Sequence, residues 1–234
     1  MAQLVFARKE MKYLVPEDRY LPFVSDLMEH TVPDVYRVYT VCNVYYDTDI
    51  FDLIRMSMDR PLYKEKMRMR SYGTPQSDTP VYVEIKKKYD RRVYKRRETL
   101  PYAAACDFFD RGIYPKNRDT QIMRELRYAL SRYQPKPSLF IAYEREAYAG
   151  IGEEKGLRVT FDRNIRYRIE DVSLAAGDHG TPLFDNSDLL LEIKFTGSMP
   201  VWLAGLLGKH GIRRRSFSKY GCIYEKEFKN IRKG

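Results

Sequence analysis

Charged residues recur at every second position along several segments of the chain, and this pattern limits what the chain can fold into. Side chains at that spacing project from one face of a β-strand. The pattern therefore predicts strands that are apolar on one face and charged on the other. The charged residues in the middle of the chain are Lys64, Lys66, Arg68 and Arg70, then Glu84, Lys86 and Lys88, then Lys95 and Arg97.

Three further segments repeat the alternation near the two ends of the chain. They hold Arg8, Glu10 and Lys12; Arg158, Thr160 and Asp162; and Glu192, Lys194 and Thr196. A solvated basic face explains any one strand. If the sheet closes into a barrel of about eight strands, however, the charged faces meet in a space that holds one small ligand. Two like charges about 7 Å apart repel by roughly 2 kcal/mol at an effective dielectric near 20, so a ring of cations favours a dense anion such as a chain of phosphates.

The carboxylates among these cations have two interpretations. Glu10, Glu84 and Glu192 could form local ion pairs with the neighbouring lysines and arginines. They could also bind Mg²⁺ or Mn²⁺, because carboxylate and phosphate oxygens are the ligands that such metals prefer. The residues alone leave both interpretations open.

Strand-forming and helix-forming segments alternate along the chain and predict an α+β fold with antiparallel hairpins. No Gly/Ser-rich linker interrupts the sequence, so we expect a single domain over residues 1–234. The expected strands are 5–14, 41–47, 62–72, 80–89, 91–100, 138–149, 156–163, 165–172 and 188–196. The expected helices are 16–30, 49–57, 102–111, 119–132 and 202–209, with turns at 73–80 and 89–91.

Composition excludes several classes of protein. The 234 residues carry 42 Lys+Arg against 32 Asp+Glu, and the net charge of +10 favours a polyanionic partner. No apolar run is long enough for a membrane span, and no secretory signal opens the sequence. Three separated cysteines argue against a disulfide framework and a zinc cluster, so we expect a cytoplasmic protein.

Nucleic-acid binding is another interpretation of the positive charge, and the aromatic residues bear on it. Base stacking would need aromatic rings among the cations. We assign Tyr63, Tyr72, Tyr82 and Tyr94 mainly to the opposite parity, and so to the core. This placement predicts no specific nucleic-acid partner.

Nine segments, in order, resemble the VTC-domain proteins of the triphosphate tunnel metalloenzyme superfamily, which is related to the CYTH domains. Each segment is weakly specific, but the ordered set is specific and covers nearly the whole chain. The segments are Arg8–Tyr13 (RKEMKY), Tyr45–Thr48 (YYDT), Lys66–Gly73 (KMRMRSYG), Val83–Lys86 (VEIK), Val93–Arg97 (VYKRR), Tyr143–Arg145 (YER), Leu157–Asp162 (LRVTFD), Leu191–Lys194 (LEIK) and Phe217–Tyr220 (FSKY).

The resemblance implies a closed antiparallel β-barrel tunnel of about eight strands, with helices packed outside and at one end, that binds a triphosphate. It implies phosphoryl transfer, foremost the ATP-dependent synthesis of inorganic polyphosphate with Mn²⁺ or Mg²⁺. The residues it assigns to phosphates are Lys12, Arg68, Arg70, Lys86, Lys95, Arg145, Arg158 and Lys219, with Arg97 and Lys194 added because they share strand faces with these. Of this set, Lys12, Arg68, Arg70, Lys86, Arg145 and Arg158 are the catalytic candidates, together with Glu192 as the metal ligand; Glu10 and Glu84 are further metal candidates.

Two departures from the family pattern change the expectations. Arg8 stands where CYTH relatives carry a first glutamate, which weakens the case for a two-metal hydrolase. Ser216 stands where eukaryotic relatives can carry a lysine near the tunnel exit. Because the membrane anchor of the eukaryotic complexes is not found, translocation of a product would need a separate membrane protein. A triphosphatase and a non-catalytic sensor of polyphosphate or inositol phosphates remain alternatives.

Overall fold

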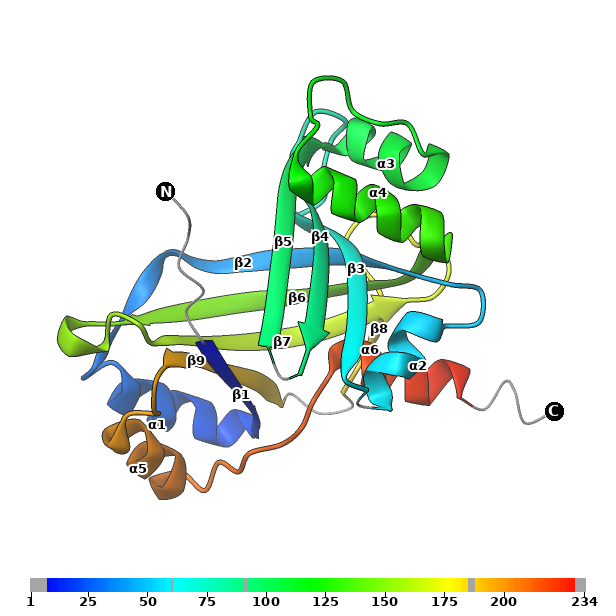
Figure 1. Ribbon diagram of the computed structural model, residues 1–234. Helices are drawn as coiled ribbons and strands as arrows, with labels where there is room; N and C mark the ends of the chain where they lie inside the picture. The colour runs from blue at the N-terminus through cyan, green and yellow to red at the C-terminus, as the bar shows by residue number, and fades with distance from the viewer. Residues whose placement is uncertain (1–7, 60, 91, 185–187, 230–234) are drawn as a thin grey trace. The chain divides into compact units, whose positions relative to one another are not determined.

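The chain folds into helices and one large antiparallel sheet, and the α+β class is confirmed (Figure 1). The computed structural model describes residues 8–59, 61–90, 92–184 and 188–229. The strands are β1 (Arg8–Val15), β2 (Thr31–Asp47), β3 (Tyr63–Tyr72), β4 (Pro80–Tyr89), β5 (Arg92–Pro101), β6 (Lys136–Gly150), β7 (Arg158–Arg168), β8 (Thr181–Pro182) and β9 (Leu189–Thr196). The helices are α1 (Glu17–Leu27), α2 (Asp52–Met58), α3 (Tyr102–Arg111), α4 (Gln121–Tyr133), α5 (Val201–Lys209) and α6 (Lys219–Ile223), with a 3₁₀ turn, η1 (Gly152–Glu154), and a π turn, η2 (Tyr224–Phe228).

The strands follow the hydrogen-bonded order β1-β9-β7-β6-β2-β3-β4-β5, and β8 pairs with β7. The pairings whose register is described, such as β1 with β9 and β3 with β4, are antiparallel. In the described part of the chain, β1 and β5 end this order and no hydrogen-bonded pairing joins them. Closure into a barrel therefore remains a prediction.

Two compact units divide the chain, and β2, β6 and β7 contribute residues to both. Unit 1 comprises residues 1–40, 143–165 and 182–218. Unit 2 comprises residues 41–142, 166–181 and 219–234. The single-domain interpretation remains a prediction.

In unit 1, one face of the sheet is apolar and packs against α1 and α5 (Figure 1). The buried side chains come from alternate positions of β1, β7 and β9, as a strand with one buried face requires. Large residues such as Phe161 and Phe23 are fully buried and supply about 2–3 kcal/mol each on removal from water. The cluster includes Tyr13, Val15, Phe23, Leu27, Val159, Phe161, Leu191, Ile193, Phe195, Leu203 and Leu207. The charged positions of the same strands consequently point to the other face.

Unit 2 repeats this arrangement with different helices. The apolar positions of β3 and β4 pack against α3 and α4, which lie beside these strands in Figure 1. The amphipathic helix α4 begins at Thr120, whose hydroxyl accepts the Met123 backbone N–H. The core includes Met67, Met69, Val81, Val83, Ile85, Leu100, Ala105, Phe108, Phe109, Met123, Leu126 and Ala129. Both helices occupy the apolar face, which leaves the charged face of these strands uncovered by them.

Most of the expected elements are confirmed, and the differences have local causes. β2 begins at Thr31 rather than at 41, because its first ten residues, which include Pro33 and a positive φ at Arg37, lack an alternating pattern. The segments 156–163 and 165–172 form one strand, β7, which ends at 168 and accommodates Asn164 at φ 49°. The short helix α6 and the π turn after it were not predicted. Residues 5–7 of the first expected strand, and Arg91 in the turn at 89–91, lie outside the described residues.

Candidate functional site

The face of β3, β4 and β5 that α3 and α4 do not cover is strongly basic, and we call it the cationic face. In these three strands it carries eight cations and one carboxylate, Glu84. The cations are Lys64, Lys66, Arg68, Arg70, Lys86, Lys88, Lys95 and Arg97. The predicted alternation is therefore confirmed within unit 2, where the register aligns residues from separate strands.

Three lysines stand directly opposite one another across the cationic face. Lys66 pairs with Lys86 across β3 and β4, and Lys86 pairs with Lys95 across β4 and β5. Like charges directly opposite on neighbouring strands destabilise a sheet. This lysine row (Lys66, Lys86 and Lys95) therefore gains stability from any bound polyanion.

Glu84 lies next to the lysine row, opposite Arg68 on β3 and Arg97 on β5, and its carboxylate contacts two cations. Arg68 Nε donates to Glu84 Oε2 at 2.5 Å, and Lys95 Nζ lies 2.8 Å from Glu84 Oε1. Burial raises the pKa of Glu84, but the charges of Arg68, Arg70 and Lys95 outweigh burial and lower it to about 2. Burial and the two arginines lower the pKa of Lys95 to about 8, although Glu84 opposes that shift. Glu84 is thus ionised at all ordinary pH, whereas Lys95 titrates just above neutrality.

Two residues of β2 hold the arginines, and the sequence analysis did not select either of them. Asn43 is buried; it accepts from Arg70 Nε at 2.9 Å and donates to the Ile141 carbonyl at 3.2 Å. The Tyr45 hydroxyl accepts from Arg68 Nη1 at 3.3 Å. Burial raises the pKa of Tyr45, but Arg68 and other cations outweigh burial and lower it to about 8. The sequence held a signal for both residues, because positions 43 and 45 are two apart in the strand expected at 41–47 and so project from one face of it.

The tyrosine assignment was wrong for part of its set. Tyr72 and Tyr82 occupy the same parity as Arg70 and Glu84, so both lie on the cationic face rather than in the core. Tyr72 is 49% exposed, and Tyr63 on the opposite face is 43% exposed. Aromatic character was taken as a sign of burial, whereas the period places two of these rings among cations.

Arg97 and Lys219 occupy different surroundings in unit 2. The Arg97 guanidinium lies 4.4 Å from the centre of the Tyr82 ring. Lys219 is the first residue of α6 and is only 8% exposed. Its neighbour Tyr220 donates to Asp47 Oδ2 at 2.8 Å. The Tyr220–Asp47 hydrogen bond holds the start of α6, and with it Lys219, at the end of β2.

Unit 1 carries a balanced set of charges instead, which we call the mixed-charge network. Its members are Glu10, Lys12, Arg145, Asp162, Glu192 and Lys194. The β1–β9 register sets Glu10 opposite Lys194 and Lys12 opposite Glu192. Lys12 Nζ lies 3.5 Å from Glu10 and 3.3 Å from Glu192, while Lys194 Nζ lies 3.9 Å and 3.5 Å from the same two carboxylates.

Arg145 joins this network from β6. Its Nε and Nη2 donate to the two oxygens of the fully buried Asp162 at 2.6 and 2.7 Å, and Nη2 also lies 3.4 Å from Glu192. Burial lowers the pKa of Arg145, but Asp162 and Glu192 outweigh burial and raise it well above its ordinary value. Arg158 of β7 stands opposite Lys194 of β9 and donates to Asp34 Oδ2 at 2.7 Å. The expected local ion pairs are thus present around Glu10, Glu84 and Glu192.

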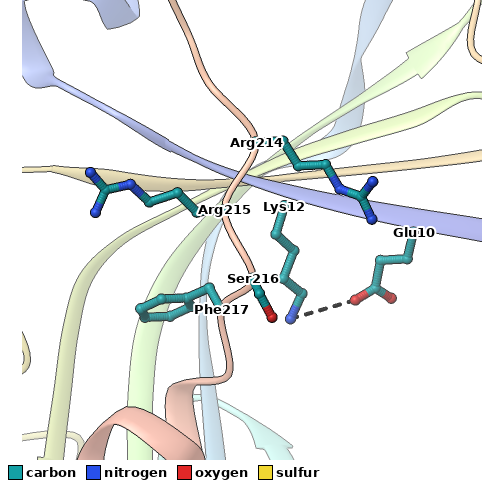
Figure 2. Close-up of a pocket in the computed structure, with 6 residues that line it drawn as sticks. All are labelled: Glu10, Lys12, Arg214, Arg215, Ser216 and Phe217. Carbon is teal, nitrogen blue, oxygen red and sulfur yellow. Dashed lines mark ion pairs between the residues drawn. The ribbon is translucent and has the colours of Figure 1, made fainter.

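A cavity of about 440 Å³ opens beside the mixed-charge network in unit 1. It is lined by Glu10, Lys12, Arg214, Arg215, Ser216 and Phe217 (Figure 2). The Arg215 backbone N–H donates to the Lys12 carbonyl at 2.9 Å, which fixes the segment that carries Ser216 against β1. Arg214 and Arg215 extend in opposite directions from this segment (Figure 2). The serine noted above therefore lines a cavity together with Lys12 and Arg214.

The metal candidates divide between the units. Glu10 and Glu192 lie in unit 1 beside Lys12, and Glu84 lies in unit 2 between Arg68 and Lys95. No cluster of three or more His, Cys, Asp or Glu side chains suited to a metal occurs among the described residues. Mg²⁺ typically takes one or two carboxylates and completes its shell with waters and substrate phosphates. The Glu10–Glu192 donor set supplies two neighbouring carboxylates and fits that pattern. Glu84 fits it poorly, because it is a single carboxylate, only 2% exposed, and held at 2.5 and 2.8 Å by Arg68 and Lys95.

The fold and these charged faces define an α+β protein that presents clustered cations on one face of an antiparallel sheet. The model of the VTC domain family matches residues 7–228, so the chain belongs to this family. No curated protein matches the sequence. No helix in the described part of the chain is long and apolar enough to cross a membrane.

Solved structures share the fold at low sequence identity. A "putative adenylate cyclase" from Bacillus halodurans is 16% identical, with a TM-score of 0.56 over 94% of this chain and 98% of that chain. A "putative adenylyl cyclase" from Hippeastrum, described as having a dominant triphosphatase activity, is 13% identical, with a TM-score of 0.54 over 95% and 98%. A third such protein, from Vibrio parahaemolyticus, is 12% identical, with a TM-score of 0.50 over 94% and 99%.

Proposed function

We propose that this protein transfers phosphoryl groups from a bound triphosphate, and that its reaction is the ATP-dependent synthesis of inorganic polyphosphate. The lysine row of the cationic face carries this proposal, because three lysines at opposed strand positions, beside Arg68 and Arg70, match a chain of phosphates. Membership of the VTC domain family and the triphosphatase activity described for the Hippeastrum protein support the same substrate class.

The phosphate-binding residues of the proposal form two sets, one within each unit. In unit 2 they are Arg68, Arg70, Lys86, Lys95, Arg97 and Lys219. In unit 1 they are Lys12, Arg145, Arg158 and Lys194. Arginine forks onto phosphate oxygens and lysine supplies a mobile point charge, so the set combines orientation with charge neutralisation.

A divalent cation, Mn²⁺ or Mg²⁺, completes the proposal. Glu192, with Glu10 as its neighbour, would hold the metal in unit 1. Glu84 is the weaker candidate because it is a single buried carboxylate held at short range by Arg68 and Lys95. When bound, the metal would neutralise charge on the phosphates. Lys12 and Lys194, which now pair with these carboxylates, would orient phosphate oxygens beside them.

The chemistry needs no protein nucleophile. An oxygen of the acceptor's terminal phosphate attacks the γ-phosphorus of ATP, the bond from this phosphorus to the β–γ bridging oxygen breaks, and ADP leaves. The acceptor grows by one phosphate. Positioning and electrostatic stabilisation do most of the work in such transfers, and the arginines and lysines of the site supply both.

Hydrolysis is the alternative reaction, with water in place of the acceptor. The activity described for the Hippeastrum protein favours it as the second candidate. Incubation of the purified protein with ATP and Mn²⁺ separates the two. Long chains resolved on a gel support synthesis, whereas orthophosphate alone, with tripolyphosphate also consumed, supports hydrolysis. Binding without any product supports a sensor.

Glu192→Gln tests the role of the proposed metal ligand. We expect turnover to fall by at least about 100-fold, because the neutral amide of glutamine binds a divalent cation more weakly than a carboxylate does, while tripolyphosphate binding in chelator stays close to that of the wild type. The matched control is Glu153→Gln, an exposed glutamate of η1 in the same unit. Unchanged turnover in Glu192→Gln would remove Glu192 from the mechanism. Cytoplasmic location and a separate membrane partner remain predictions.

A further inference from the structure

Two tyrosine rings lie together at one end of the cationic face. The centres of the Tyr72 and Tyr82 rings are 5.7 Å apart, with planes at 75°. Tyr82 stands opposite Arg70 on β3 and Thr99 on β5, and Tyr72 ends β3 two residues beyond Arg70. The rings thus continue the face that carries the lysine row, and Tyr72 leaves half of its surface open to solvent.

Arg97 completes this group. Its guanidinium lies 4.4 Å from the centre of the Tyr82 ring, which is the geometry of a cation–π contact. A planar cation and two aromatic rings offer flat surfaces, and every nucleobase has a face that stacks on such surfaces. Inorganic phosphates gain nothing from aromatic rings.

We propose that Tyr72 and Tyr82, with Arg97, form a platform that stacks the base of a nucleoside triphosphate. Lys86 lies four residues from Tyr82 along β4, or about 13 Å at the strand rise. That separation suits an extended nucleoside triphosphate with its base on the rings and its terminal phosphates on the lysine row. The platform would favour a nucleoside triphosphate over tripolyphosphate, which has no base to stack. This inference rests on the proposed function.

Single-stranded nucleic acid is the competing ligand for rings among cations. Such ligands bind through successive aromatic side chains along a groove that tracks the backbone. In β3, β4 and β5, the tyrosines of the cationic face are confined to one end, and lysines, arginines and Glu84 occupy most of the remainder. Tyr45 of β2 lies farther along, where its hydroxyl accepts from Arg68. One stacked base followed by a row of phosphates fits this arrangement better.

Calorimetric titration of ATP and of tripolyphosphate, both in chelator to prevent turnover, tests the platform. We expect Tyr72→Ala and Tyr82→Ala each to weaken ATP binding about five-fold or more, the lower end of the loss measured for base–aromatic stacking. Tripolyphosphate affinity should stay within about two-fold of the wild type, since it has no base to stack. Tyr72→Phe and Tyr82→Phe should restore ATP affinity. The control is Tyr63→Ala, a half-exposed tyrosine of β3 on the opposite face.

Each outcome decides the inference. Unchanged ATP affinity in Tyr72→Ala, or an equal loss for ATP and tripolyphosphate, overturns it, and Tyr72→Ala alone decides if Tyr82→Ala fails to fold. Single-stranded RNA that excess tripolyphosphate does not displace, and that these substitutions release, assigns the rings to nucleic acid instead. If the wild type binds neither ATP nor tripolyphosphate, the proposed function itself fails. Wild-type binding of both, without discrimination by the tyrosine variants, removes only the platform.

Discussion

The buried pair of Arg145 and Asp162 gives a stability prediction that follows from geometry alone. Asp162 is fully buried, and Arg145 contacts both of its oxygens at 2.6 and 2.7 Å. Asp162→Ala removes the carboxylate and leaves a guanidinium in the interior with the longer contact to Glu192 at 3.4 Å and the Tyr143 ring, whose centre lies 5.1 Å away. Breaking a buried pair from one side costs about 3–5 kcal/mol, because the remaining charge is uncompensated.

Urea unfolding measures this cost directly. Trp202 is the only tryptophan in the sequence and lies in unit 1, where it stacks on His30, so its fluorescence reports on the unit that contains the pair. With an m-value of about 2 kcal/mol/M, a loss of 4 kcal/mol lowers the urea midpoint by about 2 M. The control Glu29→Ala removes an exposed carboxylate of the same unit and should shift the midpoint by less than about 0.3 M.

The double variant Arg145→Met/Asp162→Leu separates the pair from its surroundings. Apolar side chains of similar size often replace a buried ion pair at little cost. We therefore expect the double variant to be more stable than Asp162→Ala. A midpoint shift below about 0.5 M for Asp162→Ala would refute the reasoning. A double variant no more stable than Asp162→Ala would also refute it.

Two further predictions concern titration and anchoring. Tripolyphosphate affinity should fall from pH 7 to pH 9, because the pKa of Lys95 is lowered to about 8 and the neutral amine binds phosphate poorly; binding raises that pKa and takes up a proton. Calorimetry in buffers of different ionisation enthalpy at pH 8 should detect this uptake, and Lys95→Arg should reduce it to the share that Tyr45, whose pKa is also lowered to about 8, contributes. Asp47→Asn should lower the free energy of unfolding by about 1–3 kcal/mol, since the buried carboxylate accepts backbone N–H groups, including that of Leu53 at 2.9 Å, and the Tyr220 hydroxyl at 2.8 Å. Thermal unfolding measures the loss, and a melting temperature equal to that of the wild type would contradict it.

The sequence predicted the strands of unit 2 well, for a physical reason. A two-residue period, together with the turns at 73–80 and 89–91, determines both the face and the approximate register of a hairpin. The opposition of Lys66, Lys86 and Lys95 follows once the strands are paired. The aromatic rings show the limit, since residue type was allowed to override the parity of Tyr72 and Tyr82.

Contacts between strands that are joined by longer connections could not be predicted in the same way. The pairing of Arg145 with Asp162 joins β6 to β7, and that of Asn43 with Arg70 depends on the β2–β3 register. Neither register is encoded by a short turn. The first ten residues of β2 lack both an alternating pattern and strong burial, so no local signal distinguished them from a loop.

The two charged faces differ in their balance, and that difference predicts opposite effects for similar substitutions. On the cationic face, Lys86 stands between two other lysines, so Lys86→Gln relieves repulsion and should leave the melting temperature unchanged or higher. In the mixed-charge network, Lys12 lies between Glu10 and Glu192, so Lys12→Gln leaves these two carboxylates to share Lys194 and should lower the melting temperature. Both should weaken tripolyphosphate binding. An unchanged or higher melting temperature in Lys86→Gln would support a ligand-binding role for Lys86, whereas a larger loss of stability in Lys86→Gln than in Lys12→Gln would show that the cationic face is structural.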